Sequence, residues 1–386
     1  MPIEFRLPTL AQIQNSSNGT LMKSLIEDDE FRSALVTGCP GSGKTTVAAM
    51  RFIRLARMKR NPTLLTFHKL LAAIIEAQVR GREATTGHVK TFMKWHTWMS
   101  HGEHVDGYLQ GLTREELARR LKVSPLSRHK GSEVLFDETQ DLPAFVCELI
   151  PAYFERAFVS TDDGQQVHDH GSSARELEEL LGDNYAYCRK ETLNYNYRNT
   201  YETYRFARQF MPRDNLVAWD PNTLERLKRD GRQGRKPEVI SYKEVSLRDE
   251  HMLTTLRNAL GNVGVLCRGV DEVKATHGLL IRAGIPSSTY HSELKGTPAE
   301  LERYLVTTYK SAKGIEFDTV VLPRVNYETR IPKEWYVACT RARGQLFVYR
   351  DLAGRDIDPL QSFEPDSFSE QILGQGPTDQ DMEIPF

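Results

Sequence analysis

The sequence predicts an α/β protein built from two parallel-sheet domains. Short apolar segments alternate with helical patterns along most of the chain, which is the order expected of doubly wound parallel sheets. The segment 34–38 leads directly into a glycine-rich loop and then into a helical pattern at 45–55. A second series of strand-like segments starts after Asn199. Two α/β units therefore share the chain.

Ten short segments are predicted to be strands. Each is apolar or β-branched for most of its length, as buried strands of parallel sheets are. Helical patterns between them include 251–260 and 271–283. The predicted strands are 34–38, 63–67, 134–137, 157–160, 238–242, 263–268, 287–291, 305–308, 319–323 and 346–350.

The glycine-rich loop, GCPGSGKTT at 38–46, fits the pattern G-x-x-x-x-G-K-[ST]. Glycines let such a loop wrap a phosphate group with its backbone N–H groups, and the following helix N-terminus adds partial positive charge. Lys44 is expected to reach the β- and γ-phosphates of a nucleotide, and the Thr45 hydroxyl to hold Mg²⁺. The nucleotide-binding candidates here are Gly38, Gly41, Ser42, Gly43, Lys44, Thr45 and Thr46.

A second part of the predicted site lies at 133–138, where an apolar run ends in two carboxylates. A parallel strand delivers such residues to its C-terminal edge, where ligands bind. Asp137 is expected to hold Mg²⁺ together with Thr45. Glu138 is expected to orient and deprotonate the attacking water. The predicted cofactors are therefore ATP and Mg²⁺.

Composition narrows the function further. The formal net charge is −1, so any nucleic acid must bind in a local groove rather than through a global basic field. The five cysteines are scattered and lack metal-binding spacing, which is typical of a reducing cytoplasm. No apolar run approaches the roughly 20 residues that span a bilayer. We therefore expect a cytoplasmic enzyme that has no membrane partner.

The order of the motifs resembles that of superfamily 1 helicases of the UvrD/Rep type. The DETQD segment at 137–141 matches their motif II. The remaining matches are LLTFHK at 64–69 and VKTF at 89–92 (motifs Ia and Ib), TDDGQ at 161–165 (III), NYRN at 196–199 (IV), TYKSAKGIEF at 308–317 (V) and VACTRA at 337–342 (VI).

This resemblance implies two RecA-like domains with ATP at their interface. Arg198 and Arg341 of the second domain would stabilise charge on the γ-phosphate. Gln165 would sense that phosphate and Glu316 would contact the ribose. Near the N-terminus Gln12, with Gln14 as the alternative, would read adenine. Residues implied to contact a single strand are Thr66, Thr91, Phe92, His170, Lys310 and Ser311, although a core position is the alternative for Phe92.

The sequence also departs from the family pattern. Too few residues separate Phe92 from 133–138, and Arg198 from 308–317, for the large accessory subdomains of UvrD-type helicases. A helical pattern at 113–121 leaves room for a small helical piece. The acidic E-E-G-x-F-P segment of the family is replaced by 325–332. The ATPase motifs are present, whereas the accessories for duplex separation are minimal or absent.

Two functions follow from the resemblance. The first is a DNA-stimulated ATP hydrolase that translocates on single-stranded DNA or unwinds DNA with 3′→5′ polarity, with RNA as the less favoured ligand. The alternative is an ATP-dependent regulatory or recruitment subunit that switches a partner, such as a nuclease in a bacterial defence system, without unwinding DNA itself. The sequence contains no recognisable nuclease constellation.

Pro, Gly, Asp, Gln and Ser dominate from residue 353 onward, which predicts an acidic and flexible tail at 353–386. The two preceding domains are expected at 1–190 and 191–352. The last residues, from Asp381 to Phe386, resemble the acidic tip of bacterial single-stranded DNA-binding protein. This resemblance implies docking to repair proteins that read that tip, and the alternative is an ordinary solvated tail.

Overall fold

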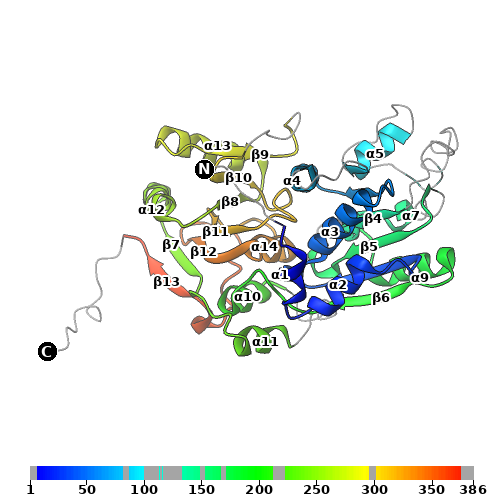
Figure 1. Cartoon of the computed structure of the whole chain (residues 1–386). Coiled ribbons are helices and arrows are strands. Elements are labelled where there is room, and N and C mark those ends of the chain that lie inside the picture. The colour runs from blue at the N-terminus through cyan, green and yellow to red at the C-terminus, as the bar shows by residue number, and fades with distance from the viewer. Residues whose placement is uncertain are drawn as a thin grey trace. The chain divides into compact units, whose positions relative to one another are not determined.

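The computed structural model describes residues 7–80, 87–99, 113, 115, 133–147, 153–166, 171–211, 222–294 and 301–374. These residues form two compact units, labelled by element in Figure 1. The first unit contains the described residues up to Tyr197 and also 222–226, and the second contains 198–211 and 227–374. The chain therefore passes between the units at Tyr197 and Arg198, several residues beyond the expected boundary at 190.

The first unit contains a six-stranded sheet in the order β3-β2-β4-β5-β1-β6, and all its pairings are parallel. Its strands are β1 (Ser33–Gly38), β2 (Thr63–Thr66), β3 (His88–Thr91), β4 (Val134–Asp137), β5 (Ala157–Thr161) and β6 (Arg189–Leu193). Its helices are α1 (Leu10–Gln14), α2 (Gly19–Glu27), α3 (Lys44–Arg57), α4 (Lys69–Arg80), α5 (Phe92–Met99), α7 (Ala144–Cys147) and α9 (Ala174–Tyr185).

The central strands of this sheet are buried on both faces because helices cover each side. Successive side chains of a strand point to opposite faces. Leu135 of β4 accordingly belongs to the same core cluster as Val47 and Phe52 of α3. Phe136, its neighbour in the sequence, belongs to a second core cluster that includes Leu177 of α9. A continuous apolar run is the pattern that such a two-sided strand requires.

The second unit contains a seven-stranded sheet in the order β13-β7-β12-β11-β8-β10-β9, again with parallel pairings. The predicted α/β class with two parallel-sheet domains is confirmed. The strands are β7 (Glu238–Tyr242), β8 (Val263–Cys267), β9 (Ser288–Tyr290), β10 (Tyr304–Thr308), β11 (Phe317–Leu322), β12 (Ala342–Asp351) and β13 (Ser369–Ile372). The helices are α10 (Tyr201–Arg208), α12 (Val245–Asn258), α13 (Val270–Arg282) and α14 (Pro332–Cys339), and the division between the units falls within α11 (Thr223–Arg229).

The predicted flexible tail is wrong for residues 353–374. Strand β13 pairs with β7 in the sheet, as Figure 1 shows in red at its edge. Phe363 and Phe368 pack against Phe206 of α10 with ring centroids 5.2 and 5.9 Å apart. A few well-spaced aromatic residues thus anchor a segment whose average composition is polar. The rest of the predicted tail, 375–386, lies outside the described residues, as does most of the predicted helix at 113–121.

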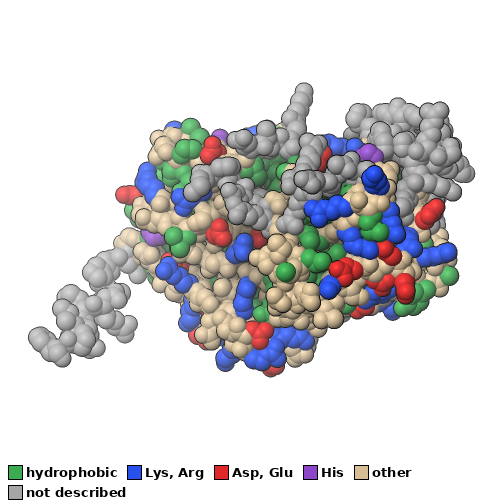
Figure 2. All heavy atoms as spheres, viewed as in Figure 1, with side chains coloured by type: hydrophobic (Ala, Val, Ile, Leu, Met, Phe, Trp, Pro, Cys, Tyr) green, Lys and Arg blue, Asp and Glu red, His purple; other side chains and the backbone are tan. Residues whose placement is uncertain are grey.

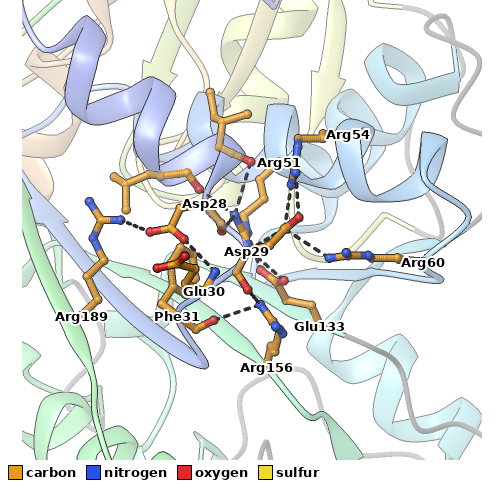
Figure 3. Close-up of polar contacts among 12 residues, drawn as sticks. Asp28, Asp29, Glu30, Phe31, Arg51, Arg54, Arg60, Glu133, Arg156 and Arg189 are labelled. Atoms are coloured by element: carbon orange, nitrogen blue, oxygen red, sulfur yellow. Dashed lines mark hydrogen bonds and ion pairs between the residues drawn. The ribbon is translucent and has the colours of Figure 1, made fainter.

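At the amino ends of the strands of the first sheet, a cluster of arginines and carboxylates fixes the start of β4 to α3 (Figure 3). The Arg51 guanidinium donates to Glu133 Oε1 at 2.5 Å and to Oε2 at 3.0 Å, and both side chains are buried. Arg51 also donates to the carbonyl oxygens of Leu25, Ile26 and Asp28. Those carbonyls lie at the C-terminal end of α2, where a helix lacks internal donors. Arg51 therefore connects two helices and a strand.

Asp29 forms the more exposed part of the same cluster. Arg54 donates to both of its carboxylate oxygens at 2.8 Å, and Arg60 lies 3.2 Å away. The hydrogen bond from Arg54, opposed by partial burial, lowers the pKa of Asp29 to about 2.

Among the described residues, no helix is long and apolar enough to cross a membrane.

Candidate nucleotide-binding site

The loop after β1 has a backbone that requires glycine. Gly41 and Gly43 have φ values of 73° and 93°, in the left-handed region that glycine adopts without strain. At Gly38 a Cβ atom would come within 2.4 Å of the Leu193 carbonyl oxygen. Gly43 is the N-cap of α3, so the loop ends at a helix N-terminus. The predicted strand, loop and helix are therefore present, and Thr45 and Thr46 lie in the first turn of α3.

Lys44 lies inside the loop rather than in solvent, with 6% of its side chain exposed. Its ammonium group donates to the carbonyl oxygens of Gly38 at 2.7 Å and Cys39 at 3.2 Å, and it lies 3.5 Å from Asp162 Oδ2. Ser42 Oγ is buried and has no hydrogen-bond partner within the described part of the chain. A buried hydroxyl without a partner is costly, and a phosphate oxygen would supply an acceptor for it.

Thr45 and Asp137 form the oxygen pair predicted for Mg²⁺. The Thr45 hydroxyl donates to Asp137 Oδ2 at 2.6 Å, and the Ser160 hydroxyl donates to the other oxygen of the same carboxylate. Burial, reinforced by the neighbouring charge of Glu138, raises the pKa of Asp137 to about 6. A bound Mg²⁺ would favour the ionised form. Two hard oxygen ligands beside a phosphate loop fit this ion.

Glu138, the candidate general base, has a left-handed backbone with φ 60° and ψ 41°. This conformation is uncommon for a residue with a side chain and is enriched at functional sites. The Gln140 amide donates to Glu138 Oε2 at 2.5 Å and holds the carboxylate in place. Only 4% of Glu138 is exposed, so the carboxylate is shielded from bulk water.

Gln140 and Asp162 extend this arrangement into a hydrogen-bonded chain. Gln140 Oε1 accepts from the backbone N–H of Asp162 at 3.1 Å. The Asp162 carboxylate accepts from the predicted phosphate sensor Gln165 at 2.5 Å. A buried path therefore runs from Lys44 through Asp162 and Gln140 to Glu138. Sequence reasoning gave no role to Asp162 or Gln140, although both stand in the matched motifs.

The second unit brings its own predicted residues together. Arg198 Nε donates to Glu316 Oε2 at 2.9 Å, and the opposite oxygen of Glu316 lies 3.4 Å from Arg343. Burial raises the pKa of Glu316, but Arg198 and Arg343 lower it more, so the net shift is downward. Arg341 is buried, and its Nε donates to the Val337 carbonyl oxygen at 2.9 Å. The predicted finger Arg198 and the predicted ribose contact Glu316 are thus direct partners.

The predicted nucleic-acid contacts fall into different environments. Thr66 is buried at the end of β2, and its hydroxyl has no partner among the described residues. Thr91 is also buried, and its hydroxyl accepts from the Lys94 N–H at 3.2 Å. Phe92 is 1% exposed and stacks on Phe136 in the core, with ring centroids 6.2 Å apart. The prediction that Phe92 stacks on bases is therefore wrong, and its alternative, the core position, is correct.

The other contact candidates lie on the second unit or outside the described residues. Lys310 is 45% exposed and lies 3.2 Å from Glu334. The Ser311 hydroxyl accepts from the Thr308 hydroxyl at 2.9 Å in the turn after β10. His170 lies outside the described residues. Both described candidates are near the carboxyl end of a parallel strand, where ligands of such sheets bind.

Gln12, the candidate for reading adenine, caps a helix. Its side-chain oxygen accepts from the Thr9 N–H at 2.8 Å, while the Thr9 hydroxyl accepts from the Gln12 N–H. These two bonds form a capping box at the start of α1. The alternative, Gln14, accepts from Lys23 at 3.4 Å. The capping role is a structural explanation for Gln12 that the sequence pattern did not reveal.

Comparison with known proteins gives a family match within the second unit. Residues 238–350 match the family described as the viral superfamily 1 RNA helicase core domain. S. cerevisiae Dbp5 bound to RNA and ADP BeF3 is 12% identical, with a TM-score of 0.56 over 95% of this chain and 94% of that chain. A variant of S. cerevisiae Dbp5 bound to Gle1 and IP6 is 11% identical, with a TM-score of 0.55 over 96% and 94%. None of the curated proteins matches the sequence significantly.

At this identity the structural likeness shows the fold alone. The two units therefore have the RecA-like fold of helicase domains. The family match adds a superfamily 1 helicase core for 238–350. This family match supports a helicase-type function that uses a nucleoside triphosphate.

Proposed function

We propose that this protein is an ATP-dependent translocase or helicase of the UvrD/Rep type that moves 3′→5′ on single-stranded DNA. One observation carries the proposal: buried Lys44, Asp137 and Glu138 lie together with half-buried Thr45 around a glycine loop. It has the groups that phosphoryl transfer needs, namely a phosphate-binding lysine, oxygen ligands for Mg²⁺ and a held carboxylate. The family match of residues 238–350 adds support.

Each residue then has a defined task in ATP hydrolysis. Lys44 binds the phosphates, and Thr45 and Asp137 hold Mg²⁺, which neutralises charge on the phosphate oxygens. Glu138 orients the attacking water and takes its proton, while Gln140 keeps the carboxylate in position. Arg198 and Arg341 stabilise the charge that develops during transfer.

The polymer is the least constrained part of the proposal. The order of the motifs favours single-stranded DNA. The matching family, however, is described by its RNA helicases, and Dbp5 was solved with RNA. The candidate contacts to a nucleic-acid strand are Lys310 and Ser311 in the second unit and the buried hydroxyl of Thr66 in the first. Hydrogen bonds to phosphates work on either polymer.

Steady-state ATP hydrolysis measured with and without nucleic acid tests this proposal. We expect single-stranded DNA to stimulate hydrolysis more than single-stranded RNA or duplex DNA does. Glu138→Gln is the matched control, since it keeps the shape of the site and removes the base. Hydrolysis that no polymer stimulates would contradict a translocase. Duplexes with a 3′ or a 5′ overhang then test polarity and unwinding.

A regulatory subunit is the second candidate, and the short connections favour it. Only residues 100–132 separate the end of α5 from Glu133, so a large accessory subdomain has no room there. Such a protein would hydrolyse ATP with nucleic acid but leave a tailed duplex intact. Unwinding by the protein alone would exclude this candidate.

The C-terminal residues provide a candidate partner site for either function. Ile384, Pro385 and Phe386 follow several acidic residues, and an apolar anchor with acidic flanks suits a basic-rimmed pocket. We propose that repair proteins which read the tip of single-stranded DNA-binding protein bind here. Deleting Pro385 and Phe386 is expected to eliminate that binding in fluorescence anisotropy and to leave ATP hydrolysis intact. Equal binding by both forms would refute the docking role.

A further inference from the structure

The segment 323–331 joins β11 to α14 and overlaps 325–332, the stretch that by motif order stands in place of the acidic segment of UvrD-type helicases. Its Tyr327 is 5% exposed although it lies in a connection rather than in a strand or helix. The Arg268 guanidinium lies over the Tyr327 ring, 5.0 Å from its centroid, and Trp335 of α14 stacks beside it at 6.5 Å. The Tyr327 carbonyl oxygen accepts from the Ile357 N–H at 2.9 Å. Three other parts of the second unit therefore meet at this residue, two at its ring and one at its backbone.

The hydroxyl group of Tyr327 lies at the centre of a small polar network. It is 3.1 Å from the Tyr309 hydroxyl, 3.2 Å from Glu272 Oε2 and 3.0 Å from the Arg324 carbonyl oxygen. The Tyr309 hydroxyl lies 3.1 Å from the same carbonyl. Burial raises the pKa of both tyrosines, so both hydroxyls keep their protons near neutral pH.

Only the hydroxyl groups of Tyr309 and Tyr327 can donate a proton within this network. The Glu272 carboxylate and the Arg324 carbonyl can only accept hydrogen bonds. The strongest arrangement gives the Tyr327 proton to the carboxylate, because a charged acceptor makes the stronger bond. The Tyr309 proton then goes to the Tyr327 oxygen or to the carbonyl. When the Tyr309 proton goes to the Tyr327 oxygen, a chain of hydrogen bonds links Tyr309 through Tyr327 to Glu272 of α13. When it goes to the carbonyl, Tyr309 is linked to Arg324 instead.

The network connects the carboxyl ends of three adjacent strands. Tyr309 directly follows β10, Arg324 comes two residues after β11, and Glu272 lies in the first turn of α13, which follows β8. In the sheet β8 lies between β11 and β10. Beyond Tyr309, the turn continues with Lys310 and Ser311, the two residues that the second unit offers to a nucleic acid.

We infer that Tyr327 is a positioning residue that fixes the turn 309–315 and thereby the two nucleic-acid contacts Lys310 and Ser311. Without the hydroxyl link, Tyr309 keeps its backbone bond to the Cys267 carbonyl at 2.9 Å. Its side chain then loses the connection to Glu272. The turn stays folded but opens more often. The nature of the ligand rests on the proposed function, whereas the positioning of the turn does not.

Hydrogen exchange of the amides in 309–315 tests the inference directly. Tyr327→Phe keeps the ring and removes only the hydroxyl. One lost hydrogen bond corresponds to about a two- to tenfold rise in opening, so exchange in the turn is expected to accelerate by that factor. Tyr309→Phe should also accelerate exchange, and the effect of the double variant should fall short of the product of the two single effects, since the two hydroxyls share one hydrogen bond.

Tyr304→Phe is the matched control, since Tyr304 lies in β10, the strand that Tyr309 directly follows. The Tyr304 hydroxyl donates to the Leu256 carbonyl oxygen at 3.1 Å, and Arg303 lies over its ring at 5.1 Å. Its bonding resembles that of Tyr327, but it lies at the opposite end of β10. This variant should leave exchange in 309–315 unchanged. Unchanged exchange in Tyr327→Phe, or equal acceleration in Tyr304→Phe, would overturn the inference.

Binding of a labelled single strand, measured by anisotropy, separates this inference from the proposed function. Tyr327→Phe should weaken binding about two- to tenfold, the same factor as for exchange, while the affinity for ATP stays unchanged. Faster exchange with unchanged strand affinity would overturn the role in binding. If exchange accelerates but the wild-type protein binds neither DNA nor RNA, the positioning stands and the proposed function is wrong.

Discussion

Removing the Glu133 carboxylate is expected to lower the unfolding free energy of the first unit by more than the removal of a surface carboxylate would. Arg51 and Glu133 are 0% and 1% exposed, and two hydrogen bonds join them. In Glu133→Ala the guanidinium remains buried because its other nitrogen still binds three carbonyl oxygens of the α2 terminus and the adjoining turn. A weaker counter-charge remains at Asp29, whose Oδ1 lies 4.0 Å from Arg51 Nη2.

The size of the effect follows from the loss of the two hydrogen bonds to Glu133, which leaves Arg51 only the longer contact with Asp29 as a counter-charge. Breaking a buried ion pair by removing one partner costs about 3–5 kcal/mol. Glu133→Gln should cost less, because the amide oxygen still accepts one of the two bonds. Arg51→Lys should also be costly, since an ammonium cannot reproduce the planar fork that bridges carboxylate and carbonyls.

Equilibrium urea unfolding of the three variants measures these differences. The control is Glu179→Ala, which removes an Arg–Glu bond of similar length, 3.0 Å, on the surface of α9. Arg175 and Glu179 are 87% and 61% exposed, and exposed pairs of this kind contribute little. If Glu133→Ala were no more destabilising than Glu179→Ala, the buried pair would not hold α3 to β4.

Three further predictions concern chemistry and pH. Lys44→Ala should weaken ATP binding, whereas Glu138→Gln should retain bound ATP without turnover; equilibrium binding and single-turnover hydrolysis distinguish the two, and normal turnover by Glu138→Gln would refute its role. Arg198→Ala should lower kcat on the order of a thousandfold with little change in ATP affinity, as steady-state kinetics would show, and wild-type turnover would contradict it. Because Arg54 lowers the pKa of Asp29 from 3.8 to about 2, the ionised carboxylate stabilises the folded state above about pH 4, and this contribution is lost as the pH falls toward 2. The difference in unfolding free energy between wild type and Asp29→Asn should therefore shrink over that range, and a constant difference would disprove the linkage.

The sequence predicted which residues would lie together at the glycine loop, because phosphate and metal chemistry permits few side chains at fixed spacing. Lys44, Thr45 and Asp137 lie where the motif requires them. Asp162 and Gln140 received no role, because the contact of Asp162 with Lys44 and that of Gln140 with Asp162 join residues that are distant in sequence. Only the fold brings Asp162 to within 3.5 Å of Lys44.

The fold was predictable to a similar extent and for similar reasons. The central strands were recognised because burial on both faces makes them continuously apolar. Strand β6 was missed because it lies at the sheet edge and its sequence, RKETL, is mostly polar. Strand β13 was missed because all four of its residues are exposed. Periodicity reports burial, and an exposed strand gives little signal.

The short strand β4 explains why the pair at its start matters for the chemistry at its end. Arg51 of α3 binds Glu133, just before the strand, and Thr45 of the same helix binds Asp137, the last residue of the strand. A slip of β4 by one residue would turn the Asp137 side chain to the other face of the sheet. It would also break the buried pair with Arg51. Two attachments to one helix thus fix both the position and the register of β4. The 2.6 Å contact between Thr45 and Asp137, at the carboxyl end of β4, therefore depends on Glu133 at its amino end.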